Sequence, residues 1–123
     1  MENKQDYQEF YKNFLTSYSS GDVSAESVGK SICDLTQFYV DENIESAMTE
    51  IQYNKVLSVI EQTTDENGKM TSSAKAKTIA ESRPEYEKYL LSKTHRDNID
   101  QILKSLKALQ QGIIIEFRNV SNT

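Results

Sequence analysis

The stretch that decides the fold runs from Ser24 to Gln62 and reads SAESVGKSICDLTQFYVDENIESAMTEIQYNKVLSVIEQ. Its first apolar side chains recur with spacings of four, three and four residues: Val28, Ile32, Leu35 and Tyr39. This is the spacing of a heptad repeat, in which one stripe of a helix faces a partner helix. Ser24 precedes the stripe and is a favourable N-cap residue, so a helix is predicted to begin there.

The apolar pattern of this stretch changes phase after Val40. It continues through two further groups, first Ile44, Ala47, Met48 and Ile51, then Val56, Leu57 and Ile60. Two interpretations stay open: one unbroken helix whose contact face rotates, or a break near Asn43 or Asn54. We favour the unbroken helix, which would be about 58 Å long at 1.5 Å per residue.

An aromatic segment precedes this stretch and predicts a shorter helix from about Asn3 to Tyr18. One face of that helix carries Tyr7, Phe10, Tyr11, Phe14, Leu15 and Tyr18. Aromatic residues at helical spacing usually lie in a core, so we expect this stripe to pack inward, with an exposed docking surface as the alternative. Ser19-Ser20-Gly21 then ends the helix.

The next segment, from Thr63 to Thr71, contains the turn-forming residues Asp65-Glu66-Asn67-Gly68-Lys69. An Asn-Gly pair can close a β-hairpin, but the flanking residues do not alternate between apolar and polar. We therefore predict a loop between helices. Thr71 or Ser72 then caps a short helix.

Pro84 suits the first turn of a last long helix, whose apolar seam runs from Tyr86 to Phe117. Gly112 either ends this helix or lies within it. The question is open because Ile113-Ile114-Ile115 has high β-propensity. The final residues, Ser121 to Thr123, are expected to fray.

These elements predict an all-α fold: a long antiparallel helical hairpin, coiled-coil-like, with a short N-terminal aromatic helix and a short helix before Pro84. We expect residues 1–123 to form a single helical domain. Residues 1–68 carry a net charge of 4 − 13 = −9 and residues 69–123 a net charge of 10 − 6 = +4, which favours antiparallel packing. Long seams that rotate in phase leave apolar surface that one hairpin cannot cover, so we also expect self-association, as a two-fold dimer.

The residue types give no zinc site, because His95 is the only histidine and Cys33 the only cysteine. We expect His95 to be a solvated surface residue and Cys33 to be buried beside the seam. The N-terminus is polar and is not expected to be a signal peptide, and no apolar run approaches the length of a membrane span. The expectation is a cytoplasmic protein that does not enter a membrane.

Glu42 and Glu45 have a spacing that places two carboxylates on one face of a helix. They resemble in part the magnesium-binding pair of all-α nucleotide pyrophosphohydrolases. A second acidic pair, Glu61 with Asp65, is spaced by four residues rather than three. We therefore interpret these carboxylates as a solvated acidic face, and expect no enzymatic activity, no cofactor and no metal.

The C-terminal half carries a basic segment interrupted by tyrosines, which is the candidate partner-binding face. Its members are Lys75, Tyr86, Tyr89, Lys93, Arg96, Lys104 and Lys107. Such residues can follow a phosphate backbone or an acidic protein surface. The alternative is that some pair with the acidic helix alongside and the others are solvated.

Several loop and packing motifs resemble those of small helical proteins of unassigned role from bacteriophages and prophages. They are Gly21 to Glu26, Asp65 to Lys69, Ser72 to Ala76, Ile79 to Glu81, Tyr86, and Leu106 to Gly112. The resemblance covers about residues 20 to 112. It implies a viral accessory protein that acts inside a bacterial cell by binding and modulating another macromolecule.

Three functional hypotheses follow. The first is a non-catalytic, phage-derived helical module that binds a host or phage protein. The second is a nucleic-acid-associated accessory factor that uses the basic C-terminal half. The third is a magnesium-dependent nucleotide pyrophosphohydrolase.

Overall fold

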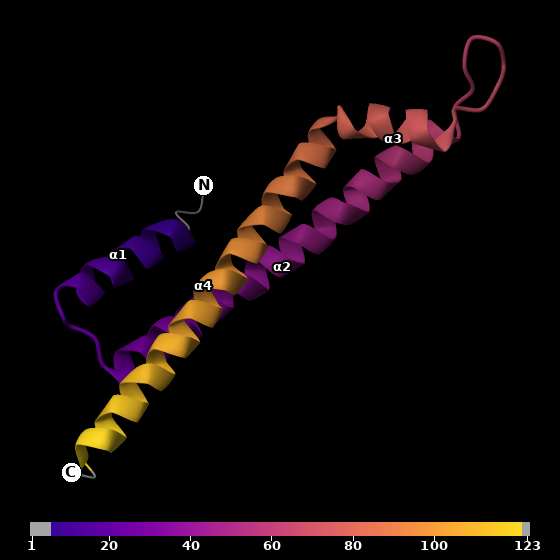
Figure 1. The fold of residues 1–123 in the computed structure, drawn as a ribbon. Coiled ribbons are helices and arrows are strands. Elements are labelled where there is room, and N and C mark those ends of the chain that lie inside the picture. Colours follow the sequence, from indigo (N-terminus) through magenta and orange to yellow (C-terminus); the bar gives the residue numbers. More distant parts are fainter. Residues whose placement is uncertain (1–5, 122–123) are drawn as a thin grey trace. The chain divides into compact units, whose positions relative to one another are not determined.

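The computed structural model describes residues 6–121, which form four helices (Figure 1). They are α1 (Tyr7–Ser19), α2 (Ala25–Glu61), α3 (Ser73–Glu81) and α4 (Pro84–Ser121). The all-α fold is confirmed, and the long helices α2 and α4 pack antiparallel, with α3 placed before Pro84.

The open questions about helix length have clear answers. α2 is unbroken, so a break near Asn43 or Asn54 is wrong. α4 continues past Gly112 and through Ile113–Ile115, so tertiary and helical context outweighs the β-propensity of this run. Residues 3–5 of the predicted first helix, and residues 122 and 123 of the predicted frayed end, lie outside the described residues.

Side-chain caps explain where the first two helices begin. Asp6 precedes α1, and its Oδ1 accepts the backbone N–H of Gln8 at 3.0 Å. At the start of α2 the caps are reciprocal: Ser24 Oγ accepts the N–H of Ser27 at 3.1 Å, and Ser27 Oγ accepts the N–H of Ser24 at 2.8 Å. Ser27 thus takes the part that glutamate usually plays in a capping box.

The loop between α2 and α3 is held by its own hydrogen bonds. Asp65 Oδ1 accepts the backbone N–H groups of Asn67 and Lys69, each at 2.9 Å, and Gly68 takes the positive φ of 79° that the turn needs. The predicted interhelical loop is confirmed, although one isolated bridge pairs Thr64 with Met70. Ser72, rather than Thr71, caps α3, and its Oγ accepts the N–H of Lys75.

The buried side of α2 keeps one heptad register from end to end, so the predicted rotation of its contact face is wrong. Positions spaced alternately by four and three residues are buried or half-buried throughout: Val28, Ile32, Leu35, Tyr39, Glu42, Ser46, Thr49, Tyr53, Val56 and Ile60. α4 has a matching series: Glu85, Tyr89, Ser92, Arg96, Ile99, Leu103, Leu106, Gln110 and Ile113. Both helices therefore have the 3.5-residue period of a coiled coil.

The chain divides into two compact units, and each contains part of α2 and part of α4. The first unit holds residues up to Val40 and from Asn98 onward, including α1. Its core is apolar, and its most deeply buried side chains are Val28, Leu35, Ile99 and Leu106. Tyr7 and Phe14 of α1 join that core, which confirms the inward packing of the aromatic stripe, whereas Leu15 and Tyr18 at its edge are exposed.

A close approach in the first unit depends on Gly29. A Cβ built at this residue would lie 2.8 Å from Gln110 Nε2, which donates to the backbone oxygen of Ala25 at 3.0 Å. The missing side chain therefore leaves room for Gln110 to reach the first turn of α2. This hydrogen bond joins α2 to α4 within the unit.

The second unit, Asp41–Asp97, has a smaller and more polar interior. Its apolar cluster is formed by Tyr53, Ile60, Ala76 and Ala80, with Tyr86 and Tyr89 packed against it. Nearer the boundary of the unit, the buried positions of the two long helices are the hydroxyl residues Ser46, Thr49 and Ser92. Thr49 Oγ1 donates to the backbone oxygen of Glu45 at 2.9 Å, so its hydroxyl is buried without losing a partner.

The apolar core of the first unit predicts a large cost for shortening Leu35, which is fully buried. We expect Leu35→Ala to lower the free energy of unfolding by about 2–5 kcal/mol, because it removes buried methyl groups and leaves a cavity. Urea denaturation followed by circular dichroism measures this change. Leu91→Ala is the matched control: Leu91 is 56% exposed, so its effect should stay within about 0.5 kcal/mol. Equal losses for the two variants would contradict the described core.

Candidate interaction surface

In the second unit, α2 is apolar on the side that faces away from its packed seam. Ile44, Met48 and Ile51 are 55%, 58% and 53% exposed, and the exposed Ala47 lies among them. Successive residues of a helix are about 100° apart, so Met48 lies about 160° around α2 from the buried Ser46. We call Ile44, Ala47, Met48 and Ile51 the α2 stripe.

Three large apolar side chains on one helical face are more than the scattered exposure that any protein surface shows. They lie at positions i, i+4 and i+7, the spacing with which helices present anchors to a binding groove or to another helix. The phase change after Val40 is the sequence signal for this surface: the apolar pattern leaves the seam there, and the seam continues with polar residues. The α2 stripe is therefore the candidate interaction surface.

Charged residues border the α2 stripe. Glu45 and Glu50 are exposed on the same helix, and Lys55 follows Ile51 by four residues, so that Ile44, Met48, Ile51 and Lys55 continue a spacing of four, three and four. Lys55 is also the only basic residue of the sequence between Lys30 and Lys69. The aliphatic stem of such a lysine can extend an apolar stripe while its ammonium group stays in water.

The predicted basic face is distributed over both units. Lys104 and Lys107 lie one turn apart on α4 in the first unit, Lys93 and Arg96 lie one turn apart on α4 in the second unit, and Lys75 lies on α3. All but the half-buried Arg96 are exposed.

Acidic neighbours on α4 engage two of these cations. Lys104 Nζ lies 3.0 Å from Asp100 Oδ2, and Arg96 Nη2 lies 3.3 Å from Asp97 Oδ1. Arg96 also donates through Nη1 to Ser46 Oγ at 3.4 Å, which attaches it to α2. Two of the five basic residues of the predicted face therefore lie beside carboxylates of their own helix.

Tyr86 and Tyr89, the aromatic members of the predicted face, are half-buried and pack on Tyr53. The ring centroid of Tyr53 lies 5.1 Å from that of Tyr86 and 5.9 Å from that of Tyr89. Burial raises the pKa of the Tyr53 hydroxyl above its ordinary value, and the neighbouring Glu81 carboxylate raises it further. This cluster belongs to the core of the second unit.

Two expectations about single residues change with the structure. Cys33 is exposed, so the predicted burial is wrong: it follows Ile32 by one position and lies about 160° around α2 from Leu35. His95 is half-buried rather than fully solvated.

Glu42 is half-buried in the seam whereas Glu45 is exposed, so these two carboxylates have different surroundings. Within residues 6–121, no three His, Cys, Asp or Glu side chains lie close enough to hold a metal ion.

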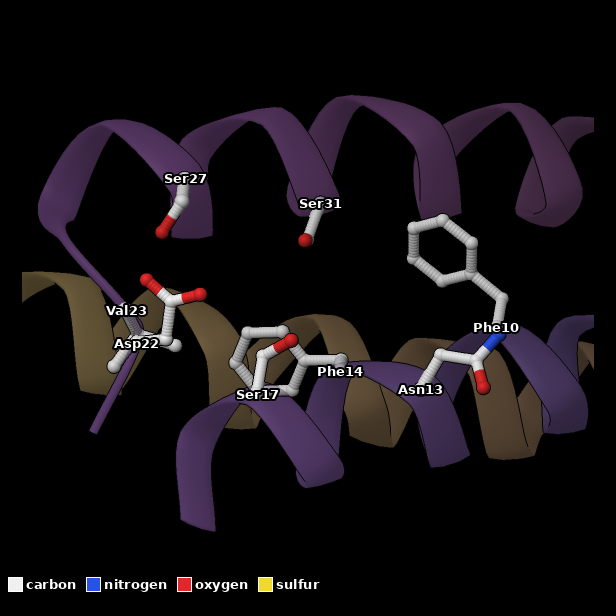
Figure 2. Close-up of a pocket in the computed structure, with 8 residues that line it drawn as sticks. All are labelled: Phe10, Asn13, Phe14, Ser17, Asp22, Val23, Ser27 and Ser31. Atoms are coloured by element: carbon white, nitrogen blue, oxygen red, sulfur yellow. The ribbon is translucent and has the colours of Figure 1, made fainter. Parts of the chain in front are cut away.

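A pocket of about 290 Å³ lies in the first unit between α1 and the start of α2 (Figure 2). Phe10 and Phe14 of α1 form its apolar part, and the Asp22 carboxylate faces the hydroxyls of α2. One of those hydroxyls, on Ser27, already takes part in the helix cap. Asp22 is the one ionisable lining residue, so the pocket offers hydrogen bonds but no pair of groups for acid–base chemistry.

No helix in the described part of the chain combines the length and the hydropathy that crossing a bilayer requires. Comparisons with protein-family models, with curated proteins and with solved structures find no match to this chain. Function must therefore be inferred from the residues described above.

The raised pKa of Tyr53 makes stability sensitive to alkaline pH. An unfolded tyrosine ionises at about pH 10, whereas folded Tyr53 keeps its proton to a higher pH. In that window the unfolded state has released a proton that the folded state still holds, so the free energy of unfolding falls as pH rises. We expect Tyr53→Phe to remove this part of the fall, measured by urea denaturation from pH 8 upward.

Tyr18→Phe serves as the control for that measurement, because Tyr18 is 49% exposed and lies outside the cluster around Tyr53. Identical pH profiles for the two variants would contradict the role of burial at Tyr53.

Proposed function

We propose that this chain is a non-catalytic helical module that binds and modulates another macromolecule. The observation that carries the proposal is the α2 stripe: three large apolar side chains, each more than half exposed, on a helix whose opposite side is packed. Because the seam residues hold α2 in place, the stripe is presented on a rigid element. Binding there would bury apolar area without first paying to order the helix.

We propose a protein as the class of partner. An apolar stripe with anchors at i, i+4 and i+7 suits a protein groove or a second helix. Nucleic acid would instead be held by contacts between phosphates and cations, and on α4 the carboxylates of Asp97 and Asp100 lie beside Arg96 and Lys104. These two carboxylates lower the local positive charge that a phosphate backbone would meet, which favours protein over nucleic acid.

The proposed setting is that of a phage-derived accessory protein in the cytoplasm of a bacterial cell, with a host or phage protein as partner. It is supported by the resemblance of the loop and packing motifs between about residues 20 and 112. Self-association as a dimer is part of the same proposal, since a hairpin of two long helices leaves the α2 stripe uncovered.

Site-specific photo-crosslinking tests the proposed function. A photoreactive amino acid would replace Met48 in the full chain, expressed in bacterial cells, and a matched variant would carry it at Lys30, an exposed α2 residue outside the stripe. We expect protein adducts from position 48 that position 30 does not give. Adding Ile51→Lys to the position-48 variant should reduce them by roughly tenfold, because a charge would enter the contact.

Three outcomes of this experiment would overturn the proposal. One is the absence of any adduct at position 48, and another is equal labelling at positions 30 and 48. The third is adducts that nuclease treatment removes, which would assign the surface to nucleic acid instead.

A further inference from the structure

We infer that the α2 stripe binds the α2 stripe of a second copy of this chain, in antiparallel orientation. The two-fold axis that relates the copies lies level with the midpoint between Met48 and Ile51. This inference rests on the proposed function, because it names the partner of the same surface. It is carried by two features of the stripe, its spacing and the charges that border it.

The spacing of the stripe is that of a second coiled-coil seam. Ile44, Met48, Ile51 and Lys55 are separated by four, three and four residues, so they lie on one narrow line of α2, opposite the seam that faces α4. A two-fold axis level with the midpoint of Met48 and Ile51 places Met48 of each copy against Ile51 of the other, so this contact occurs two times in the interface. The unbranched side chain of Met48 can adapt to such a repeated contact.

The same axis brings Ile44 level with Lys55 of the second copy at both ends of the seam. There the aliphatic stem of the lysine can cover the isoleucine, and its ammonium group can stay at the rim. The line of α2 residues from Ile44 to Lys55 is thus complementary to itself: two apolar layers lie in the centre, and amphipathic layers lie outside them.

Charge decides the direction of pairing. Glu45 is one residue from Ile44, so the antiparallel arrangement puts it beside Lys55 of the second copy, less than one helical turn away along the axis. A parallel arrangement in register would set Lys55 against Lys55 and Glu45 against Glu45. Like charges at facing positions oppose association, so the antiparallel pair is favoured.

Lys55 has few alternatives within its own segment. It is the only basic residue between Lys30 and Lys69, a stretch that contains eight acidic residues in all. The second copy supplies a carboxylate from that same acidic stretch at the matching level. Symmetry then makes each interface carry two Glu45–Lys55 pairs, which set the orientation of the copies more than the strength of their association.

Analytical ultracentrifugation of the full chain over a concentration series tests the inference. We expect a monomer–dimer equilibrium whose dissociation constant rises roughly a hundredfold in Met48→Lys, because an ammonium group would be buried at the centre. Leu91→Lys is the matched control, since Leu91 is an equally exposed apolar residue of α4 in the same unit, at 56%. It should leave the equilibrium unchanged, and circular dichroism verifies that both variants are folded.

Charge reversal tests the direction of the pair. Glu45→Lys and Lys55→Glu should each weaken the dimer by roughly tenfold, and the double variant should restore it. In a chain with Cys33→Ser, a mixture of Ile44→Cys and Lys55→Cys molecules should form a 44–55 disulfide between copies. Disulfides joining 44 to 44 would indicate parallel pairing and overturn the inference.

A monomer at every concentration, or a dimer that Met48→Lys leaves intact, would also overturn it. Failure of the inference is distinguishable from failure of the proposed function. A monomeric chain that still gives stripe-dependent photoadducts with a different protein keeps the function and loses the self-pairing. A monomeric chain that gives no adduct loses both.

Discussion

The heptad register of α2 against α4 is the constraint on which the rest of the structure depends. From Val28 to Ile60 the buried residues of α2 are spaced alternately by four and three residues, and the buried residues of α4 have the same spacing. An α-helix has few ways to keep one line of residues turned toward a partner over such a length. Once that line of residues is packed against α4, helical geometry fixes the direction in which every other residue of α2 points. It therefore also decides which apolar residues face outward.

In the middle of α2 the buried seam is polar, and the large apolar residues of the same section form the exposed stripe. At Ser46, Thr49 and Ser92 the buried side chains are small and carry hydroxyl groups. Ser46 Oγ accepts from Arg96, and Thr49 Oγ1 donates to backbone oxygens of its own helix, so the burial of these groups costs little. The large apolar residues of this section, Ile44, Met48 and Ile51, lie on the other side of α2. This section thus combines little apolar burial inside with a large exposed apolar surface outside, and the proposed function is based on that surface.

The sequence allowed the fold class, the four elements and the unbroken α2 to be predicted, because helical spacing, capping residues and turn residues are local signals. It did not allow the contact face of the middle section to be predicted. The apolar periodicity continues from Val40 to Ile44, whereas the packed side of α2 continues through Glu42 and Ser46. The same reasoning misplaced Cys33, because closeness in sequence to the seam is not closeness in angle around the helix.

The candidate surface was predictable in kind but not in position. The phase change after Val40 indicated apolar surface that one hairpin could not cover, yet only burial identifies Ile44, Met48 and Ile51 as that surface. The tyrosines of the predicted basic face illustrate the opposite case. Tyr86 and Tyr89 carry hydroxyls suited to an interface, but their rings are used to cover Tyr53. No local signal separates a tyrosine that packs from one that binds, since both occupy amphipathic positions.

The charge split between the two halves of the chain acts differently from what its arithmetic suggests. Arg96 and Lys104 pair with Asp97 and Asp100 of α4 itself, so these two ion pairs do not join α4 to the acidic helix. Hydrogen bonds to uncharged groups join the two helices instead: Gln110, admitted by Gly29, donates to Ala25, and Arg96 donates to Ser46. Glu45, Glu50 and Lys55 are exposed on α2, whereas Glu42 is half-buried in the seam. The exposed carboxylates would repel most acidic surfaces. In the antiparallel pair that we propose, however, Glu45 of each copy lies beside Lys55 of the other.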